Sequence, residues 1–143
     1  MKDDFKKFFL AGVIQGSKKG RNLYKQDYRK KIRFLLKRYF PQARIVDPVK
    51  VHPNSAQYAH NKGRSVFYRS IRQARQCDCF VAYLPTASMG TAIEMWECRS
   101  RKIPIWVISP LEENWSIKFL SSKIFRNMRE FERSLSTMKK WQG

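Results

Sequence analysis

The chain has 143 residues and a mass of 17.1 kDa, and its 30 lysines and arginines against 11 aspartates and glutamates give a formal net charge of +19. This length suits one domain, and the 43% hydrophobic and 14% aromatic residues exclude a disordered basic tail. No apolar run approaches the roughly 20 residues of a membrane-spanning helix, and residues 8–14 lack the form of a signal peptide. We therefore expect residues 1–143 to form a single soluble domain, with no membrane partner, that binds phosphate-bearing molecules.

Four apolar segments, each bounded by proline or polar residues, predict buried β-strands. They are residues 8–14, 43–47, 79–84 and 103–108, and a weaker fifth candidate covers residues 123–126. Their hydrophobicity is continuous rather than alternating, which is typical of strands that are covered on both faces in a parallel sheet.

Amphipathic segments between these strands predict helices over residues 23–39, 65–76, 90–100, 115–122 and 128–136. In the first of them, Arg29, Arg33 and Lys37 fall opposite the apolar side, which predicts a solvated basic stripe. Residues 49–64 show no periodicity, so we expect a long loop, of the kind that often binds ligands. The alternation of strands and helices predicts a three-layer α/β fold with a four- to five-stranded parallel sheet.

Cysteine usage indicates a reducing compartment. The chain has three cysteines, Cys77, Cys79 and Cys98, which is an odd number and includes no C-x-x-C spacing. The two histidines add no metal-ligating pattern. We therefore expect three buried thiols, no metal site, no cofactor and a cytoplasmic location.

Ligands of an open parallel sheet bind at the carboxyl ends of its strands, so the loops that follow the strands are the first candidates for a site. The loop after the first strand contains Gln15, two glycines (Gly16 and Gly20), a serine and three cations. Such a loop either cradles an anion through its backbone N–H groups or is an ordinary basic turn. It matches neither the dinucleotide-binding pattern nor a Walker loop.

The most informative pattern follows the third strand, where residues 84–97 read LPTASMGTAIEMWE. A helix that begins near Gly90 places Glu94 in its first turns, close to the carboxyl edge of the sheet. The helix dipole favours an ionised carboxylate there by about 0.3–1 kcal/mol, and nucleophilic attack on a sugar carbon requires such a group. The alternative is an ordinary acidic residue at a helix start. Ser88 either binds a phosphate or sugar hydroxyl or caps the helix.

Residues 78–84 (DCFVAYL) and 88–94 (SMGTAIE) together resemble the signature of the nucleoside 2-deoxyribosyltransferase superfamily. The segments FLAG (9–12) and KIPI (102–105) are similar to neighbouring strands of that family, and the resemblance covers roughly residues 8–125. It implies a flavodoxin- or Rossmann-like domain, a homodimer, and cleavage of an N-glycosidic bond through a glycosyl-enzyme formed on Glu94. Transferases carry Asp where this chain has Ser88, and serine there is similar to the 2-deoxynucleoside 5′-phosphate N-hydrolase branch.

The same resemblance marks further candidate residues. That branch has Asp at the position of Ser70, and Asp47 at the end of the second strand is a candidate replacement. Ser121 resembles a second phosphate-binding serine, contributed across a dimer interface. The remaining candidate substrate-binding residues are Gly12, Gln15, Gly16, Met89, Gly90 and Asn114.

Three functions remain open from the sequence. The first is hydrolysis of a nucleoside 5′-monophosphate through Glu94, the second is deoxyribosyl transfer between bases, and the third is non-catalytic binding of a nucleotide or nucleic acid. Ten lysines and arginines lie between residues 18 and 38, which is more than one phosphate requires. Because no helix-turn-helix, zinc-finger or RNA-recognition pattern is present, a nucleic-acid partner would be held through its backbone.

Overall fold

The computed structural model describes residues 5–14 and 25–140, except for the side chains of residues 139 and 140. Five parallel strands form one sheet in the order β2-β1-β3-β4-β5, which is the flavodoxin-like order. The strands are β1 (Lys7–Gly12), β2 (Arg44–Val46), β3 (Cys79–Tyr83), β4 (Ile105–Ile108) and β5 (Lys123–Phe125). The predicted parallel sheet is confirmed, including its weak fifth strand.

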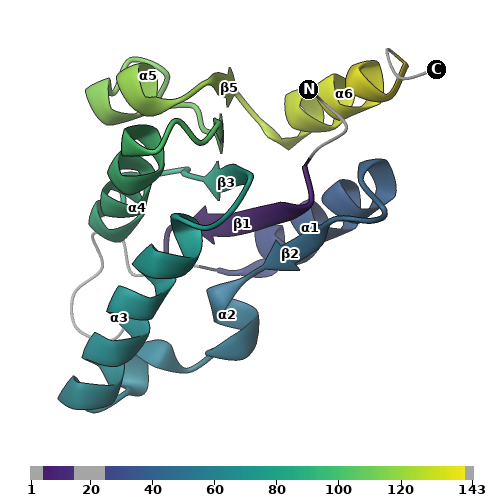
Figure 1. Cartoon of the computed structure of the whole chain (residues 1–143). Coiled ribbons are helices and arrows are strands. Elements are labelled where there is room, and N and C mark those ends of the chain that lie inside the picture. Colours follow the sequence, from purple (N-terminus) through teal and green to yellow (C-terminus); the bar gives the residue numbers. More distant parts are fainter. Residues whose placement is uncertain (1–4, 15–24, 141–143) are drawn as a thin grey trace.

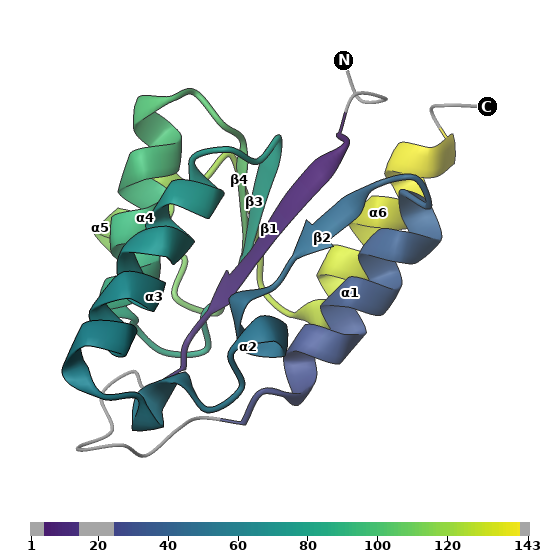
Figure 2. The same ribbon diagram turned by 60° about the horizontal axis from the view of Figure 1, so that its bottom comes forward.

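Helices cover both faces of the sheet, as Figures 1 and 2 show. On one face lie α1 (Asp27–Tyr39) and α6 (Met128–Lys140). On the other lie α3 (His60–Ala74), α4 (Met89–Ser100) and α5 (Trp115–Leu120). The predicted three-layer α/β fold is therefore confirmed. No helix in the described part of the chain is long and apolar enough to cross a bilayer.

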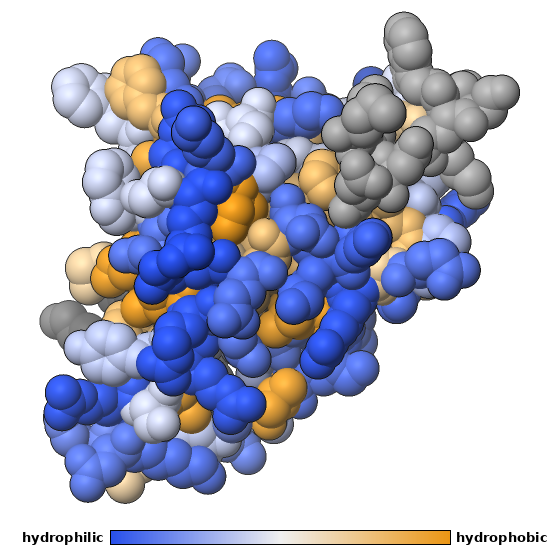
Figure 3. Space-filling view, viewed as in Figure 1, coloured by the Kyte–Doolittle hydropathy of each residue, from blue (hydrophilic) through white to orange (hydrophobic). Residues whose placement is uncertain are grey.

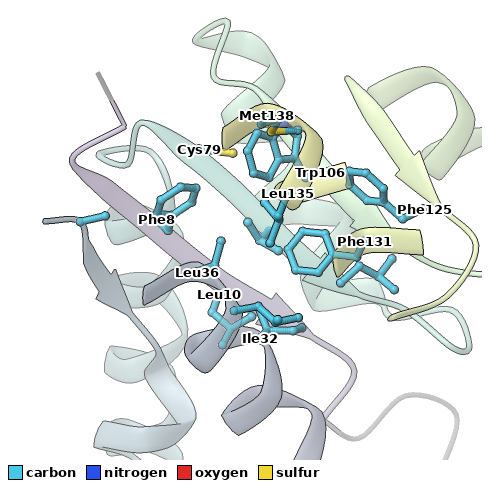
Figure 4. Close-up of a cluster of buried hydrophobic side chains, with 14 residues drawn as sticks. Phe8, Leu10, Ile32, Leu36, Cys79, Trp106, Phe125, Phe131, Leu135 and Met138 are labelled. Carbon is cyan, nitrogen blue, oxygen red and sulfur yellow. The ribbon is translucent and has the colours of Figure 1, made fainter. Parts of the chain in front are cut away.

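Each central strand contributes to two hydrophobic cores, because its successive side chains point to opposite faces. In β1, Phe8 and Leu10 pack under α1 and α6, where Ile32 and Phe131 meet them (Figure 4). The alternate residues of β1, such as Phe9, pack on the other face under α3, α4 and α5. This two-sided burial explains why the strand segments are continuously apolar in the sequence. All three cysteines are free and buried, as expected.

The expectation of a loop over residues 49–64 is wrong in part. A short helix, α2 (Pro48–Val51), and a 3-10 turn, η2 (Ser55–Gln57), lie within it, and α3 begins at His60. The Asp47 carboxylate caps α2 by accepting a hydrogen bond from the backbone N–H of Val49 at 3.1 Å. The first turn of α3 escaped detection because residues 60–64 (HNKGR) include no large apolar side chain to reveal a helical period.

Candidate active site

A cavity of about 630 Å³ lies at the carboxyl edge of the sheet. Gly12 at the end of β1 lines it, together with residues of α2, η2, α3 and the first turns of α4. From β1 the sheet continues to β2 on one side and to β3 on the other. The cavity therefore occupies the topological switch point, where ligands of such sheets bind.

The cavity brings together six of the candidate residues from three elements of the fold. These are Gly12 from β1, Ser70 from α3, Ser88 at the start of α4, and Met89, Gly90 and Glu94 within α4. Residues 70 and 94 are 24 positions apart in the sequence, yet both line one cavity because α3 and α4 lie side by side (Figure 1).

Glu94 lies in the second turn of α4, with its side chain half-buried at the cavity wall. Burial raises the pKa of the Glu94 carboxyl from its usual 4.5 to about 8, although the charge of Arg29 lowers it. Burial therefore opposes the ionisation that the helix dipole favours, because a poorly hydrated site disfavours a charge.

Arg29 is the cation whose charge lowers the Glu94 pKa, and the residue is only 3% exposed. Its Nη1 donates to the Asp47 carboxylate at 2.9 Å and to the Leu10 carbonyl at 3.3 Å, and its Nε donates to the Gln26 side chain at 2.8 Å. These partners hold the guanidinium in one place, and they come from β1, from the residue after β2 and from the residue before α1.

The expected solvated basic stripe of α1 is wrong for Arg29 and Arg33. Arg33 also pairs with the buried Asp47 carboxylate, so two guanidiniums share one carboxylate. Sequence periodicity placed both arginines on the outer side of the helix, because it cannot show that a carboxylate at the end of β2 faces α1. The positive charge of Arg29 favours the ionised form of Glu94 and so opposes the rise in the Glu94 pKa.

The Asp47 carboxylate is fully used within this cluster. It accepts hydrogen bonds from Arg29, Arg33 and the backbone of Val49, and its side chain is 1% exposed. Asp47 is not among the residues that line the cavity. It orders Arg29, whereas Ser70 lines the cavity.

Ser88 both caps α4 and lines the cavity. Its hydroxyl oxygen accepts a hydrogen bond from the Thr91 backbone N–H at 3.3 Å, and the hydroxyl donates to Thr91 Oγ1 at 3.0 Å. Gly90 follows in the first turn, and a Cβ there would meet nothing within 4 Å. The amino-terminal end of α4, where the helix dipole is positive, therefore borders the cavity with little side-chain cover.

Gly12 has a packing reason for being glycine. A Cβ at this position would lie 2.8 Å from the Tyr83 carbonyl oxygen and 2.9 Å from Cε2 of Tyr28. The Tyr28 hydroxyl donates to the Val13 carbonyl at 3.1 Å, and burial raises its pKa to about 12. The close approach of α1 to the end of β1 therefore requires glycine, whether or not a ligand contacts it.

The other candidate residues lie elsewhere. Asn114 caps α5, accepting hydrogen bonds from the backbone of Ser116 at 3.1 Å and Ile117 at 3.4 Å. Ser121 ends α5, and its buried hydroxyl has no hydrogen-bond partner within the described ranges. Neither lines the cavity. Gln15 and Gly16 lie outside the described residues, as does the rest of the expected anion-binding loop up to residue 24.

Sequence reasoning missed two parts of the site. The first is the apolar wall of the cavity, to which Val66, Phe67 and Ile71 of α3 contribute. Helical periodicity assigns Phe67 and Ile71 to the buried side of the helix, and nothing local distinguishes a cavity wall from a packed interior. The second is Arg29, whose burial depends on its distant partners. Among the residues that the structure describes, no three metal-ligating side chains gather in one place.

No protein-family model matches the sequence, and no curated protein matches it. Solved structures do match. A 2-deoxyribosyltransferase from Bacillus psychrosaccharolyticus is 15% identical, with a TM-score of 0.64 over 90% of this chain and 95% of that one. The solution structure of BlsM is 18% identical, with a TM-score of 0.62 over 95% and 91% of the two chains.

A conserved protein from Enterococcus faecalis V583 is 15% identical, with a TM-score of 0.63 over 94% of this chain and 99% of that one. At these identities the likeness shows the fold. The chain thus has the α/β fold of a 2-deoxyribosyltransferase over nearly its whole length.

Proposed function

We propose that the protein cleaves the bond between base and sugar in a nucleoside 5′-monophosphate, with Glu94 as the nucleophile. The observation that carries the proposal is a half-buried glutamate at the wall of a cavity of about 630 Å³, at the switch point of the sheet. The likeness of the fold to a 2-deoxyribosyltransferase supports nucleoside glycosyl chemistry at this position.

The reaction proceeds by two displacements. In the first, a carboxylate oxygen of Glu94 forms a bond to the anomeric carbon, the C–N bond breaks, and its electron pair leaves with the base, which takes up a proton from solvent. In the second, water attacks the same carbon, loses a proton, and releases the sugar phosphate and the free Glu94 carboxylate. Atoms and charges balance without a further reactant.

The two sides of the cavity suit the two ends of a nucleotide. Ser88 and Gly90 border it at the amino-terminal end of α4, and a helix amino terminus attracts the negative charge of a phosphate. Val66 and Ile71 form an apolar wall on α3, which suits the faces of a base. The buried Arg29 favours the ionised Glu94 that the attack requires.

Deoxyribosyl transfer is the second candidate, and the fold of the Bacillus enzyme favours it. In that reaction a second base, rather than water, takes the sugar from Glu94. Adding an acceptor base to the reaction and measuring exchanged nucleotide separates transfer from hydrolysis.

The proposal is tested by incubating the protein with a panel of nucleoside and deoxynucleoside 5′-monophosphates and measuring the release of free base by chromatography. We expect release from at least one member of the panel, and a loss of about 1,000-fold or more in Glu94→Gln, which keeps the shape of the side chain but removes the nucleophile.

Glu97→Gln is the matched control, because Glu97 lies on the same helix and pairs with Arg75 at 3.3 Å away from the cavity. We expect it to keep the wild-type rate. If no member of the panel releases base, or if Glu94→Gln cleaves as fast as the wild type, the proposed function is wrong.

A further inference from the structure

A second hollow, shallow and of about 640 Å³, adjoins the cavity at the amino-terminal half of α3. Three aromatic rings, those of Tyr58, Phe67 and Tyr68, line it together with Arg64 and Gly63. Gly63 and Phe67 line the cavity as well, so the hollow and the cavity are neighbours along α3.

The rings of the hollow are unusually accessible for large apolar groups. Phe67 is 45% exposed and Tyr68 is 50% exposed, and the two rings meet edge to face at 5.6 Å with an interplanar angle of 78°. Tyr58 is held by a hydrogen bond of 3.0 Å between its hydroxyl and Nδ1 of His52, a residue of the cavity wall. Exposed rings fixed in this way are suited to stacking against bases.

Cations accompany these rings. The ammonium group of Lys62 lies 4.1 Å from the centre of the Tyr58 ring, and the guanidinium carbon of Arg64 lies 5.9 Å from that of Tyr68. Neither cation forms an ion pair with a residue of the described ranges. Figure 3 shows hydrophilic residues along the outer side of α3, with apolar residues between them.

The segment around the hollow contains no acidic residue at all. From residue 48 to residue 77 there is no Asp or Glu, while six lysines and arginines occur, namely Lys50, Lys62, Arg64, Arg69, Arg72 and Arg75. Two carboxyl groups of α4 face α3: Glu97 pairs with Arg75 at the far end of α3, and Glu94 lines the cavity. Neither lines the hollow, whose charged lining residue is Arg64, so the hollow attracts phosphates.

We propose that this hollow binds a second nucleotide, so that the ligand of the protein is a single-stranded oligonucleotide with a 5′-phosphate. Its first nucleotide occupies the cavity, the base of the next stacks on Tyr58, Phe67 or Tyr68, and the phosphate between them lies near Arg64. This inference rests on the proposed function for the occupant of the cavity. A duplex does not suit the hollow, because its bases already stack on one another and offer no free face to an aromatic side chain.

The test uses a hexadeoxynucleotide that carries a 5′-phosphate and a 3′-fluorophore, with binding followed by fluorescence anisotropy at about 0.15 M salt. We expect the single strand to bind at least tenfold more tightly than a nucleoside 5′-monophosphate used as competitor. Tyr68→Ala and Arg64→Gln should each weaken hexanucleotide binding by about tenfold, since one stacked base contributes 5- to 150-fold in affinity. Tyr68→Phe should restore it, because the ring is kept.

The matched control is Arg129→Gln, which removes one exposed cation from α6 on the opposite face of the sheet. We expect it to leave hexanucleotide binding within about twofold of the wild type. An equal loss in Arg129→Gln and Arg64→Gln would overturn the proposal, because attraction by net charge alone gives that result. Equal affinity for a blunt duplex of the same sequence would overturn it as well.

The failure of this proposal and the failure of the proposed function give different results. If single strands bind through Tyr68 but no base is released from any substrate, the hollow stands and the N-glycosidase proposal is wrong. If a nucleoside 5′-monophosphate is cleaved while the hexanucleotide binds no more tightly than the monophosphate, the hollow is not a nucleotide site and the proposed reaction stands.

Discussion

Packing does not require the glycine at position 90, in the first turn of α4. A Cβ at this position would meet nothing within 4 Å, and the backbone there is helical, so alanine fits without strain. Glycine inside a helix costs about 0.5–1 kcal/mol relative to alanine. Stability therefore favours alanine, while the open space next to the cavity favours a ligand that approaches the helix end.

The first prediction follows from this contrast. Gly90→Ala should raise the free energy of unfolding by about 0.5 kcal/mol, measured by urea denaturation. It should also lower kcat/KM for the nucleotide substrate by about tenfold, because the new methyl group enters the space next to the α4 amino terminus. Gly63→Ala is the comparison for stability, because Gly63 also lies in a helix, α3, and its added Cβ would meet Tyr58 at an ordinary 3.9 Å. Unchanged kinetics in Gly90→Ala would contradict a ligand at this position.

Glu94 gives a prediction about pH dependence. The attacking group is the carboxylate, and burial raises its pKa to about 8, so kcat/KM should rise with pH up to about 8 and level off above it. A profile that is flat from pH 5 to pH 9 would show that the ionisation of Glu94 does not limit the reaction.

The same raised pKa has a consequence for stability, with a definite sign. Between about pH 4.5 and pH 8 the folded protein binds a proton at Glu94 that the unfolded chain has lost, so this group stabilises the fold less as the pH rises. Glu94→Gln has no such dependence. Its Tm should therefore exceed that of the wild type by an amount that grows from pH 5 to pH 8, reaching on the order of 10 °C, measured by calorimetry.

At the scale of elements, α1 is held to β2 by a buried charge cluster. Asp47 accepts from both Arg29 and Arg33, so its loss leaves two guanidiniums against a poorly hydrated interior. Asp47→Asn should lower the free energy of unfolding by about 3 kcal/mol, whereas Asp27→Asn, at the exposed start of the same helix, should change it by less than about 1 kcal/mol. Equal small effects in urea denaturation would contradict a structural role for the cluster.

The elements that could be predicted are those with a strong local pattern. The strands β1, β3 and β4 and the helices α1 and α4 follow from runs of apolar residues and from helical spacing, which depend on few neighbours. The short helix α2 and the first turn of α3 could not be predicted, because neither segment shows a helical period of apolar residues. The inward position of Arg29 could not be predicted either, because it depends on a carboxylate that is distant in the sequence.

At the scale of the whole molecule, the helices α4 and α5 expose large apolar side chains on one face of the sheet. Trp96 is 61% exposed, and Trp115 and Phe119, which are 77% and 61% exposed, pack edge to face at 5.8 Å. Exposed apolar groups gathered on neighbouring elements are typical of protein interfaces. If the homodimer implied by the sequence resemblance forms, we expect its interface on this face.

This proposal predicts the mass of the protein in solution. Sedimentation equilibrium should give about twice the 17.1 kDa of one chain, and Trp96→Glu should give one chain, because it places a charge in the apolar face. Phe34→Glu is the control, since Phe34 is 60% exposed on α1, on the opposite side of the sheet. A wild-type protein that sediments as one chain would refute the dimer.

The sequence by itself determined the α/β fold, the parallel sheet and the strand-to-helix segment that carries Ser88, Gly90 and Glu94, because buried strands and helix starts leave a mark within a few residues. Only the tertiary structure decided which groups meet across distant segments. It brought Ser70 and Glu94 to one cavity, turned Arg29 inward against Asp47, and raised the pKa of Glu94 through burial. Burial and charge pairing depend on three-dimensional neighbours, and the spacing of residues along the chain does not contain them.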